Sequence, residues 1–67
     1  MAPKARMASK LKSLREQRGM TQEQLAERSG LSRTYLARLE TGRQDPTLST
    51  LEKLAKALKV KVAKLIE

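Results

Sequence analysis

Leucines recur along most of this chain at the spacing of amphipathic helices. Between residues 47 and 58 the apolar positions stand three or four apart, which predicts a helix capped by Thr47 with one apolar side. A narrower stripe of Leu11 and Leu14 predicts an earlier helix over residues 8–18. In the later helix, the positions predicted to point inward are Leu48, Leu51, Leu54, Ala55 and Leu58.

The segment from Thr21 to Gly42 has the pattern of two short helices joined by a tight turn. Thr21 can cap the first helix, predicted over residues 22–29, and Gln24 completes a Thr-x-x-Gln capping box. Gly30 permits the turn because glycine tolerates a positive φ angle. Two helices joined by a short turn that contains glycine are typical of a helix-turn-helix.

The second helix of this segment is predicted over residues 33–41, with Ser32 as its cap. At about 100° of rotation per residue, Leu36 and Leu39 share its buried side. Cations and hydroxyl groups on the opposite face can donate to phosphates and guanine edges, and a small residue there can approach a thymine methyl group. The residues on or beside that outward face are Arg33, Thr34, Ala37, Arg38 and Thr41.

These features together resemble the Cro-like (XRE) helix-turn-helix family, to which the phage lambda-type repressors and Cro proteins belong. The similarity extends from Leu11 to Ile66 and implies an all-α, compact five-helix, lambda-repressor-like DNA-binding domain over residues 8–67. Residues 1–7 contain two cations and show no periodicity, so we expect a flexible basic arm there. The matching residues are Thr21, Gln22, Leu25, Ala26, Gly30, Leu31, Ser32, Leu36, Leu39, Glu40, Gly42 and Pro46.

The resemblance also implies which residues meet DNA. Tyr35, about 70° off the buried direction, has two predicted roles: it can pack over the junction of the third and fourth helices or give its hydroxyl to a phosphate. Base contacts are expected from Arg33, Thr34, Ala37 and Arg38. Gln22 and Arg43 match positions that contact the DNA backbone, and we expect further backbone contacts from Ser32, Tyr35, Thr41 and Lys10.

Arg15 and Glu40 match a structural ion pair of the family. In that family an arginine of the first helix pairs with the glutamate that ends the DNA-reading helix. A planar guanidinium suits a carboxylate because it can donate two parallel hydrogen bonds. The alternative is that both side chains are solvated charges.

The tail after residue 58 is expected to form a turn and a short fifth helix, as in the family. Lys61 departs from the family pattern, because a Ser or Asp that could cap the helix often stands there and lysine cannot cap it. The tail is more apolar than a small core requires, which predicts a homodimer interface; alternatively, all of these residues close the core. The predicted interface residues are Val60, Val62, Leu65 and Ile66.

Charge favours a polyanionic partner without proving one. The net charge is +8 over 67 residues, with +5 in residues 1–20, 0 in 21–46 and +3 in 47–67. Such a balance suits double-stranded DNA, although a lysine-rich solvated surface would look the same. No apolar run reaches about 18 residues, so no membrane span is predicted and a cytoplasmic, nucleoid-associated protein is expected.

Catalysis and metal binding are disfavoured by composition. The chain has no histidine and no cysteine, which excludes disulfides and the usual zinc sites, so no metal or cofactor is expected. Glu23 and Glu27 share a helix face, but a solvated surface explains them better than chemistry does. The sequence therefore does not favour an enzyme.

Two functions remain in view. The first is a sequence-specific DNA-binding transcriptional regulator, a repressor or controller that reads a near-palindromic operator as a homodimer. The alternative is an antitoxin or bridging-type interaction module on the same fold, with a protein partner. A protein-only module has no need of the cationic outward face that Arg33 and Arg38 give the second motif helix, so that face favours the regulator.

Overall fold

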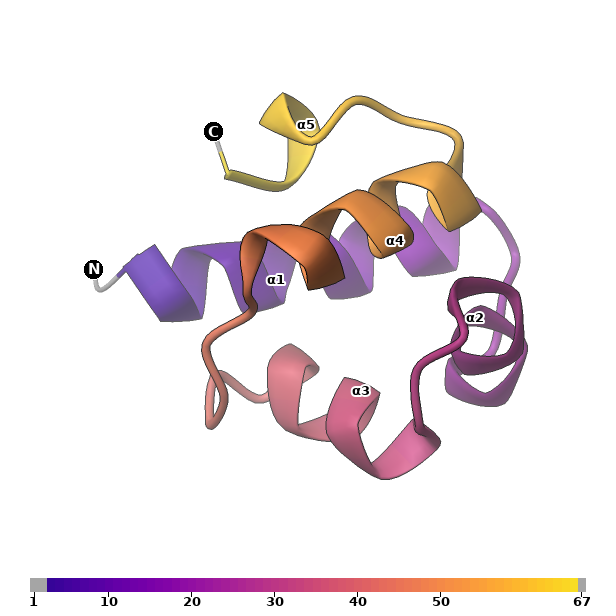
Figure 1. Ribbon diagram of the computed structural model, residues 1–67, viewed down its shortest axis with the longest axis horizontal. Coiled ribbons are helices and arrows are strands. Elements are labelled where there is room, and N and C mark those ends of the chain that lie inside the picture. Colours follow the sequence, from indigo (N-terminus) through magenta and orange to yellow (C-terminus); the bar gives the residue numbers. More distant parts are fainter. Residues whose placement is uncertain (1–2, 67) are drawn as a thin grey trace.

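The part of the chain that the structure describes contains five helices joined by turns and loops, and no strand occurs in that part. The computed structural model describes residues 3–66, with side chains from residue 7 onward. In Figure 1, α3 lies at the bottom of the view and α5 at the top, with α1 and α4 between them. The predicted all-α, five-helix class is confirmed. The helices are α1 (Pro3–Gln17), α2 (Gln22–Ser29), α3 (Arg33–Glu40), α4 (Leu48–Leu58) and α5 (Ala63–Ile66).

The first helix begins earlier than the sequence pattern predicts. α1 starts at Pro3, so residues 3–7 are helical and do not form the expected arm. Proline suits the first helical position because its φ angle is preset and its missing N–H would have no partner there. Met7 is 5% exposed, and burying its side chain gives the early turns a reason to form. Residues 1–2 of the predicted arm lie outside the described residues.

Leucine side chains dominate the core. Burying each one contributes about 1.5–3 kcal/mol to stability, so these side chains hold the five short elements together. Leu48 is an exception to the predicted inward set, because it is 66% exposed at the first position of α4. A helical wheel gives a direction only, and the neighbouring elements cover Thr50 in that first turn but not Leu48. The fully buried side chains are Leu11, Leu25, Leu36, Leu39, Leu54, Leu58 and Leu65.

The C-terminal end of α4 is closed by a lysine in an uncommon backbone conformation and by an arginine that directly follows α1. Lys59 adopts the left-handed conformation with φ 58°, which glycine adopts more easily. Arg18 donates from Nε to the main-chain oxygen of Leu58 over 2.9 Å. The predicted short fifth helix is present, and it starts without a side-chain cap: the N–H of Lys64 donates to the carbonyl of Lys61 over 2.9 Å.

Candidate nucleic-acid interface

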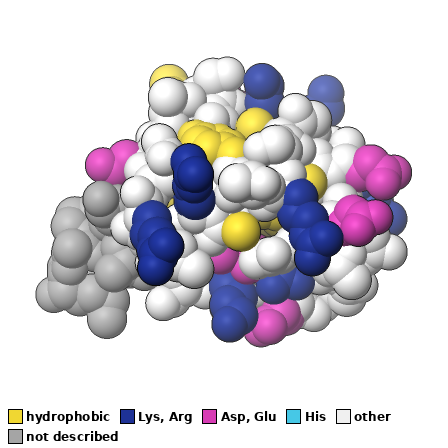
Figure 2. Space-filling view, turned by 90° about the horizontal axis from the view of Figure 1, so that it is seen from below, with side chains coloured by type: hydrophobic (Ala, Val, Ile, Leu, Met, Phe, Trp, Pro, Cys, Tyr) yellow, Lys and Arg dark blue, Asp and Glu magenta, His cyan; other side chains and the backbone are white. Residues whose placement is uncertain are grey.

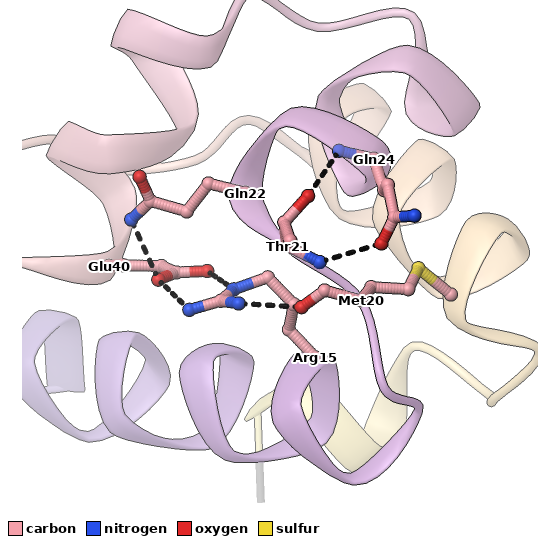
Figure 3. A network of polar contacts seen from close by, with 6 residues as sticks. All are labelled: Arg15, Met20, Thr21, Gln22, Gln24 and Glu40. Atoms are coloured by element: carbon pink, nitrogen blue, oxygen red, sulfur yellow. Dashed lines mark hydrogen bonds and ion pairs between the residues drawn. The ribbon is translucent and has the colours of Figure 1, made fainter.

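The helix-turn-helix starts with a complete capping box. Thr21 Oγ1 accepts a hydrogen bond from the N–H of Gln24 over 3.1 Å, and Gln24 Oε1 accepts one from the N–H of Thr21 over 2.9 Å (Figure 3). Two main-chain donors at the start of α2 are thereby satisfied. This local chemistry explains why α2 begins at the predicted residue.

The turn between α2 and α3 depends on Gly30. Its φ angle is 76°, in the left-handed region, and the N–H of Leu31 donates to the carbonyl of Ala26 over 3.1 Å. Ser32 then caps α3, since its hydroxyl accepts from the N–H of Tyr35 over 3.0 Å. These bonds set the direction in which α3 leaves the turn.

The two faces of α3 differ as the sequence predicts. Leu36 and Leu39 are fully buried, whereas Arg33, Thr34 and Arg38 are exposed and Ala37 is half-buried. Figure 2 views the molecule from the side of α3, where basic side chains spread over the surface and acidic ones lie mainly toward its edges. The structure therefore brings the four predicted base-contacting residues together on one outward surface.

The structure joins Arg15 of α1 to Glu40 of α3. Arg15 Nε donates to Glu40 Oε2 over 2.6 Å, and Nη2 donates to Oε1 over 3.1 Å (Figure 3). Both residues are 9% exposed, and Arg15 Nη1 also donates to the carbonyl of Met20 over 2.7 Å. Hydrogen bonding to Glu40 raises the pKa of the Arg15 guanidinium above its already high ordinary value. The arginine thus stays charged, and the last residue of α3 is anchored to α1.

Gln22 belongs to the same network. Its Nε2 donates to Glu40 Oε1 over 3.1 Å, so one of its two amide hydrogens is engaged inside the protein. Gln22 is half-buried at the first position of α2. The expected contact with the DNA backbone is left to its second amide hydrogen and to nearby main-chain N–H groups, which have no intrahelical partner.

The other predicted backbone contacts differ in what they can offer. Arg43 lies in the loop after α3, and the Ser32 hydroxyl is exposed beside the turn. Thr41 Oγ1 donates to the carbonyl of Arg38 over 3.1 Å. A phosphate oxygen can only accept hydrogen bonds, and a hydroxyl group has a single hydrogen to donate. Thr41 already donates that hydrogen to Arg38, so it cannot donate it to a phosphate in this conformation.

Tyr35 packs at the junction between α3 and α4. Its hydroxyl lies 3.3 Å from that of Thr50, and the side chain packs against the core. Of the two roles that the sequence left open for Tyr35, packing over the junction is the one seen in the structure. A tyrosine hydroxyl can both donate and accept, so this contact is compatible with a second one to phosphate.

Lys10 is separate from the other predicted DNA contacts. It lines a shallow hollow of about 250 Å³ with Ser13, Leu14 and Gln17 of α1 and with Lys64 of α5. α5 lies on the opposite side of the molecule from α3 (Figure 1). The structure thus does not group Lys10 with Arg43 and the residues of α3.

The predicted interface residues fall into two groups. Ile66 is 58% exposed, and Val60 and Val62 are half-buried. Leu65 does not fit the prediction, because its side chain is fully buried within the chain, where α5 packs on the core. Alternation in the sequence could not separate these cases, since only the packing of α5 decides which side is covered.

Three further contacts were not predicted from the sequence: those of Gln22 with Glu40, Arg18 with Leu58, and Arg33 with Glu23. The last joins Arg33 Nη1 and Glu23 Oε2 over 3.8 Å, with both side chains about 70% exposed, so it contributes little. Each contact links residues from different parts of the fold, so no local pattern could reveal it.

Among the described residues, no group of three or more possible metal ligands lies together. None of the helices in that part of the chain has the length and apolar character needed to span a membrane.

The fold and the outward polar face of α3 define a helix-turn-helix protein. The family described as helix-turn-helix (HTH_3) matches residues 11–65, and the chain belongs to this family. The resemblance to the Cro-like (XRE) group, seen first in the residues of the motif, is thereby confirmed.

Curated relatives of this chain are regulators by name. The chain is 45% identical over 60 residues to the immunity repressor protein of Bacillus phage phi105, covering 90% of this chain and 42% of that protein. It is 48% identical over 60 residues to the control protein C.SmaI of Serratia marcescens, covering 90% of this chain and 71% of that protein. The chain therefore spans less than half of the phage repressor and most of the controller.

Solved structures superpose on more than nine tenths of this chain. The restriction-modification controller protein C.AhdI from Aeromonas hydrophila superposes with a TM-score of 0.89 at 36% identity, covering 91% of this chain and 92% of that one. A hypothetical transcription factor, NHTF from Neisseria, gives a TM-score of 0.94 at 36% identity, covering 98% of this chain and 76% of that one.

Proposed function

We propose that this chain is a sequence-specific DNA-binding transcriptional regulator, a repressor or controller that reads a near-palindromic operator as a homodimer. The observation that carries this proposal is the outward face of α3. Arg33, Thr34 and Arg38 are exposed there, although Leu36 and Leu39 on the other side of the same helix are fully buried. Exposed cations and a hydroxyl on a rigid helix suit base edges in a major groove.

The mechanism is occupancy of a DNA site. α3 enters the major groove, and Arg33 and Arg38 donate to base edges. The small side chain of Ala37 lets the helix lie close to the bases. Arg43 and the start of α2 contact phosphates on either side, which fixes the depth and register of the helix. A regulator bound in this way blocks polymerase or recruits it, and it would act at the nucleoid.

The exposed apolar part of the tail supports the homodimer. Val60, Val62 and Ile66 offer partly uncovered apolar surface near the chain's C-terminal helix. A second copy that covers this surface would place two copies of α3 about 34 Å apart, in successive major grooves on one side of the duplex. Such an arrangement reads a two-fold symmetric operator.

The deciding experiment is selection of bound duplexes from a random pool, followed by salt titration on the selected site. We expect one symmetric sequence to be enriched. We also expect log K to fall with log salt concentration by about 0.9 for each phosphate neutralised. The double variant Arg33→Ala/Arg38→Ala serves as the control and should lose the enrichment while keeping the fold. A random pool recovered without enrichment, together with a flat salt response, would overturn the proposal.

A further inference from the structure

Gln22 stands where the start of α2 meets the end of α3. It is the first residue of α2, and its partner Glu40 is the last residue of α3. Glu40 Oε1 accepts from both Gln22 Nε2 and Arg15 Nη2, each over 3.1 Å (Figure 3). We infer that Gln22 is a positioning residue, whose amide fixes the angle of α3 against α2 and thereby sharpens base preference. This inference rests on the proposed function.

The hydrogen bond between Gln22 and Glu40 gives α2 and α3 a second connection besides the turn. The turn from Gly30 to Ser32 connects the end of α2 to the start of α3, and its bonds fix that corner. The bond between Gln22 and Glu40 connects the two other ends. Arg15 anchors the same carboxylate to α1, so Glu40 is held from two directions. Without the bond from Gln22, the far end of α3 would still be held to α1 by Arg15 but no longer to α2, so its angle against α2 would be less fixed.

A small rotation is enough to disturb base reading. α3 has eight residues, which corresponds to about 12 Å of helix. Rocking by about 5° around the turn would move the far end by about 1 Å over that length. Hydrogen bonds to bases weaken steeply when they lengthen by much less than that. Arg38 lies near the end held by Glu40, whereas Arg33 lies next to the turn, so base contacts of Arg38 depend more on Gln22.

This role is separable from a contact with phosphate. The amide of Gln22 is neutral, and its bond to Glu40 leaves its second hydrogen and its oxygen free for other partners. Removing a phosphate contact weakens binding to all DNA sequences alike, since phosphates carry no sequence information. A misplaced reading helix instead reduces the difference in affinity between the correct operator and its single-base variants.

The test is the variant Gln22→Met, which keeps side-chain length but cannot donate a hydrogen bond. Its affinity is measured for the selected operator and for a panel of duplexes that each carry one base change. We expect discrimination to fall about fivefold or more at the base pairs that depend on Arg38, and less at those that depend on Arg33. Gln17→Met is the matched control, because Gln17 is an exposed amide on α1 that donates only to Ser13.

Two further variants keep the inference open to refutation. Gln22→Lys retains a donor that reaches Glu40, so it should restore discrimination even though its charge raises affinity for all DNA. In the background Arg15→Met/Glu40→Met, which replaces the ion pair with apolar side chains, Gln22→Met should have no further effect on discrimination.

The outcomes separate the inference from the proposed function. If Gln22→Met weakens binding to every duplex alike and discrimination is retained, the residue only contacts phosphate; the inference is then overturned and the proposed function stands. The same holds if Gln22→Lys fails to restore discrimination. If the wild-type protein shows no preference among duplexes, the proposed function falls, and the inference falls with it.

Discussion

The hydroxyl oxygen of Tyr35 lies 3.3 Å from that of Thr50, and this contact joins α3 to the first turn of α4. Thr50 is buried, and its hydroxyl also accepts from Thr47 Oγ1 over 3.1 Å. A chain of three hydroxyl groups therefore links the residue that caps α4 to the helix that presents the candidate reading surface.

Replacing Tyr35 with Phe should cost about 1 kcal/mol of unfolding free energy in urea denaturation, because one partly buried hydrogen bond is removed. If Thr50 is the donor, the Tyr35 hydrogen is free for phosphate, and the variant should also bind all duplexes more weakly. Thr50→Val breaks the same bond from the other side and serves as the control, with DNA affinity unchanged. Unchanged affinity in Tyr35→Phe would show that the hydroxyl serves the junction alone.

Replacing Glu40 should lower the stability of the fold far more than replacing Tyr35 does. In Glu40→Ala the guanidinium of Arg15 stays buried without its carboxylate partner, and we expect a loss of about 3–5 kcal/mol of unfolding free energy. Urea denaturation followed by circular dichroism measures the loss. Glu23→Ala removes an exposed carboxylate from a weak pair and should cost less than about 1 kcal/mol. Equal losses in the two variants would contradict the structural role of the buried pair.

Arginines on α3 and in the following loop should affect binding differently. Arg33→Ala and Arg38→Ala should each relax preference at particular base pairs, by about 1–3 kcal/mol for every good bidentate hydrogen-bonded pair that the substitution removes. Arg43→Ala should weaken binding to all duplexes alike and reduce the salt slope by about one phosphate. Competition binding against single-base operator variants measures both effects. If base preference survives the combined replacement of Arg33, Thr34 and Arg38, α3 is not the reading helix, and the interaction-module alternative gains.

Glycine at position 59 should stabilise the protein. Lys59 has a φ angle of 58°, which costs a residue with a Cβ atom about 1 kcal/mol more than glycine. Lys59→Gly should therefore raise the free energy of unfolding by up to about 1 kcal/mol in urea titrations. The matched change Lys56→Gly, inside α4, should lower it by about 1 kcal/mol. The two signs must differ if the conformation of residue 59 is as described.

The uncovered part of the tail should control self-association. Ile66→Asp should raise the dimer dissociation constant about tenfold or more, measured by analytical ultracentrifugation. Leu48→Asp is the control, since Leu48 is the other large apolar side chain that is exposed among the described residues. Exposed lysines at 59, 61 and 64 would approach their counterparts in a dimer, so added salt should strengthen association while it weakens DNA binding. A wild-type protein that stays monomeric with and without DNA would contradict the homodimer.

The sequence predicted those features that depend on neighbouring residues. The start of α2 at Gln22 follows from Thr21 and Gln24, and the turn follows from Gly30, because caps and turns involve residues only a few positions apart. The buried side of α3 follows in the same way from its helical period. These local rules were enough to place the candidate reading face.

Features that depend on distant residues could not be predicted in the same way. The early start of α1 depends on a core that covers Met7, and the exposure of Leu48 depends on what lies beside the first turn of α4. The side of α5 that carries Leu65 is chosen by packing against the rest of the chain. Gln22 and Glu40 are 18 positions apart, so their bond has no signature in either helix alone.

The position of Tyr35 also gives the protein a built-in optical reporter. It is the only aromatic residue, since the chain has one tyrosine and no tryptophan or phenylalanine. The leucine-filled core is silent in the near ultraviolet, so intrinsic emission and near-ultraviolet dichroism arise at the junction of α3 and α4. Changes in these signals during a DNA titration would report on the side of the molecule that carries α3, while unfolding of the core must be followed by the far-ultraviolet signal of the helices.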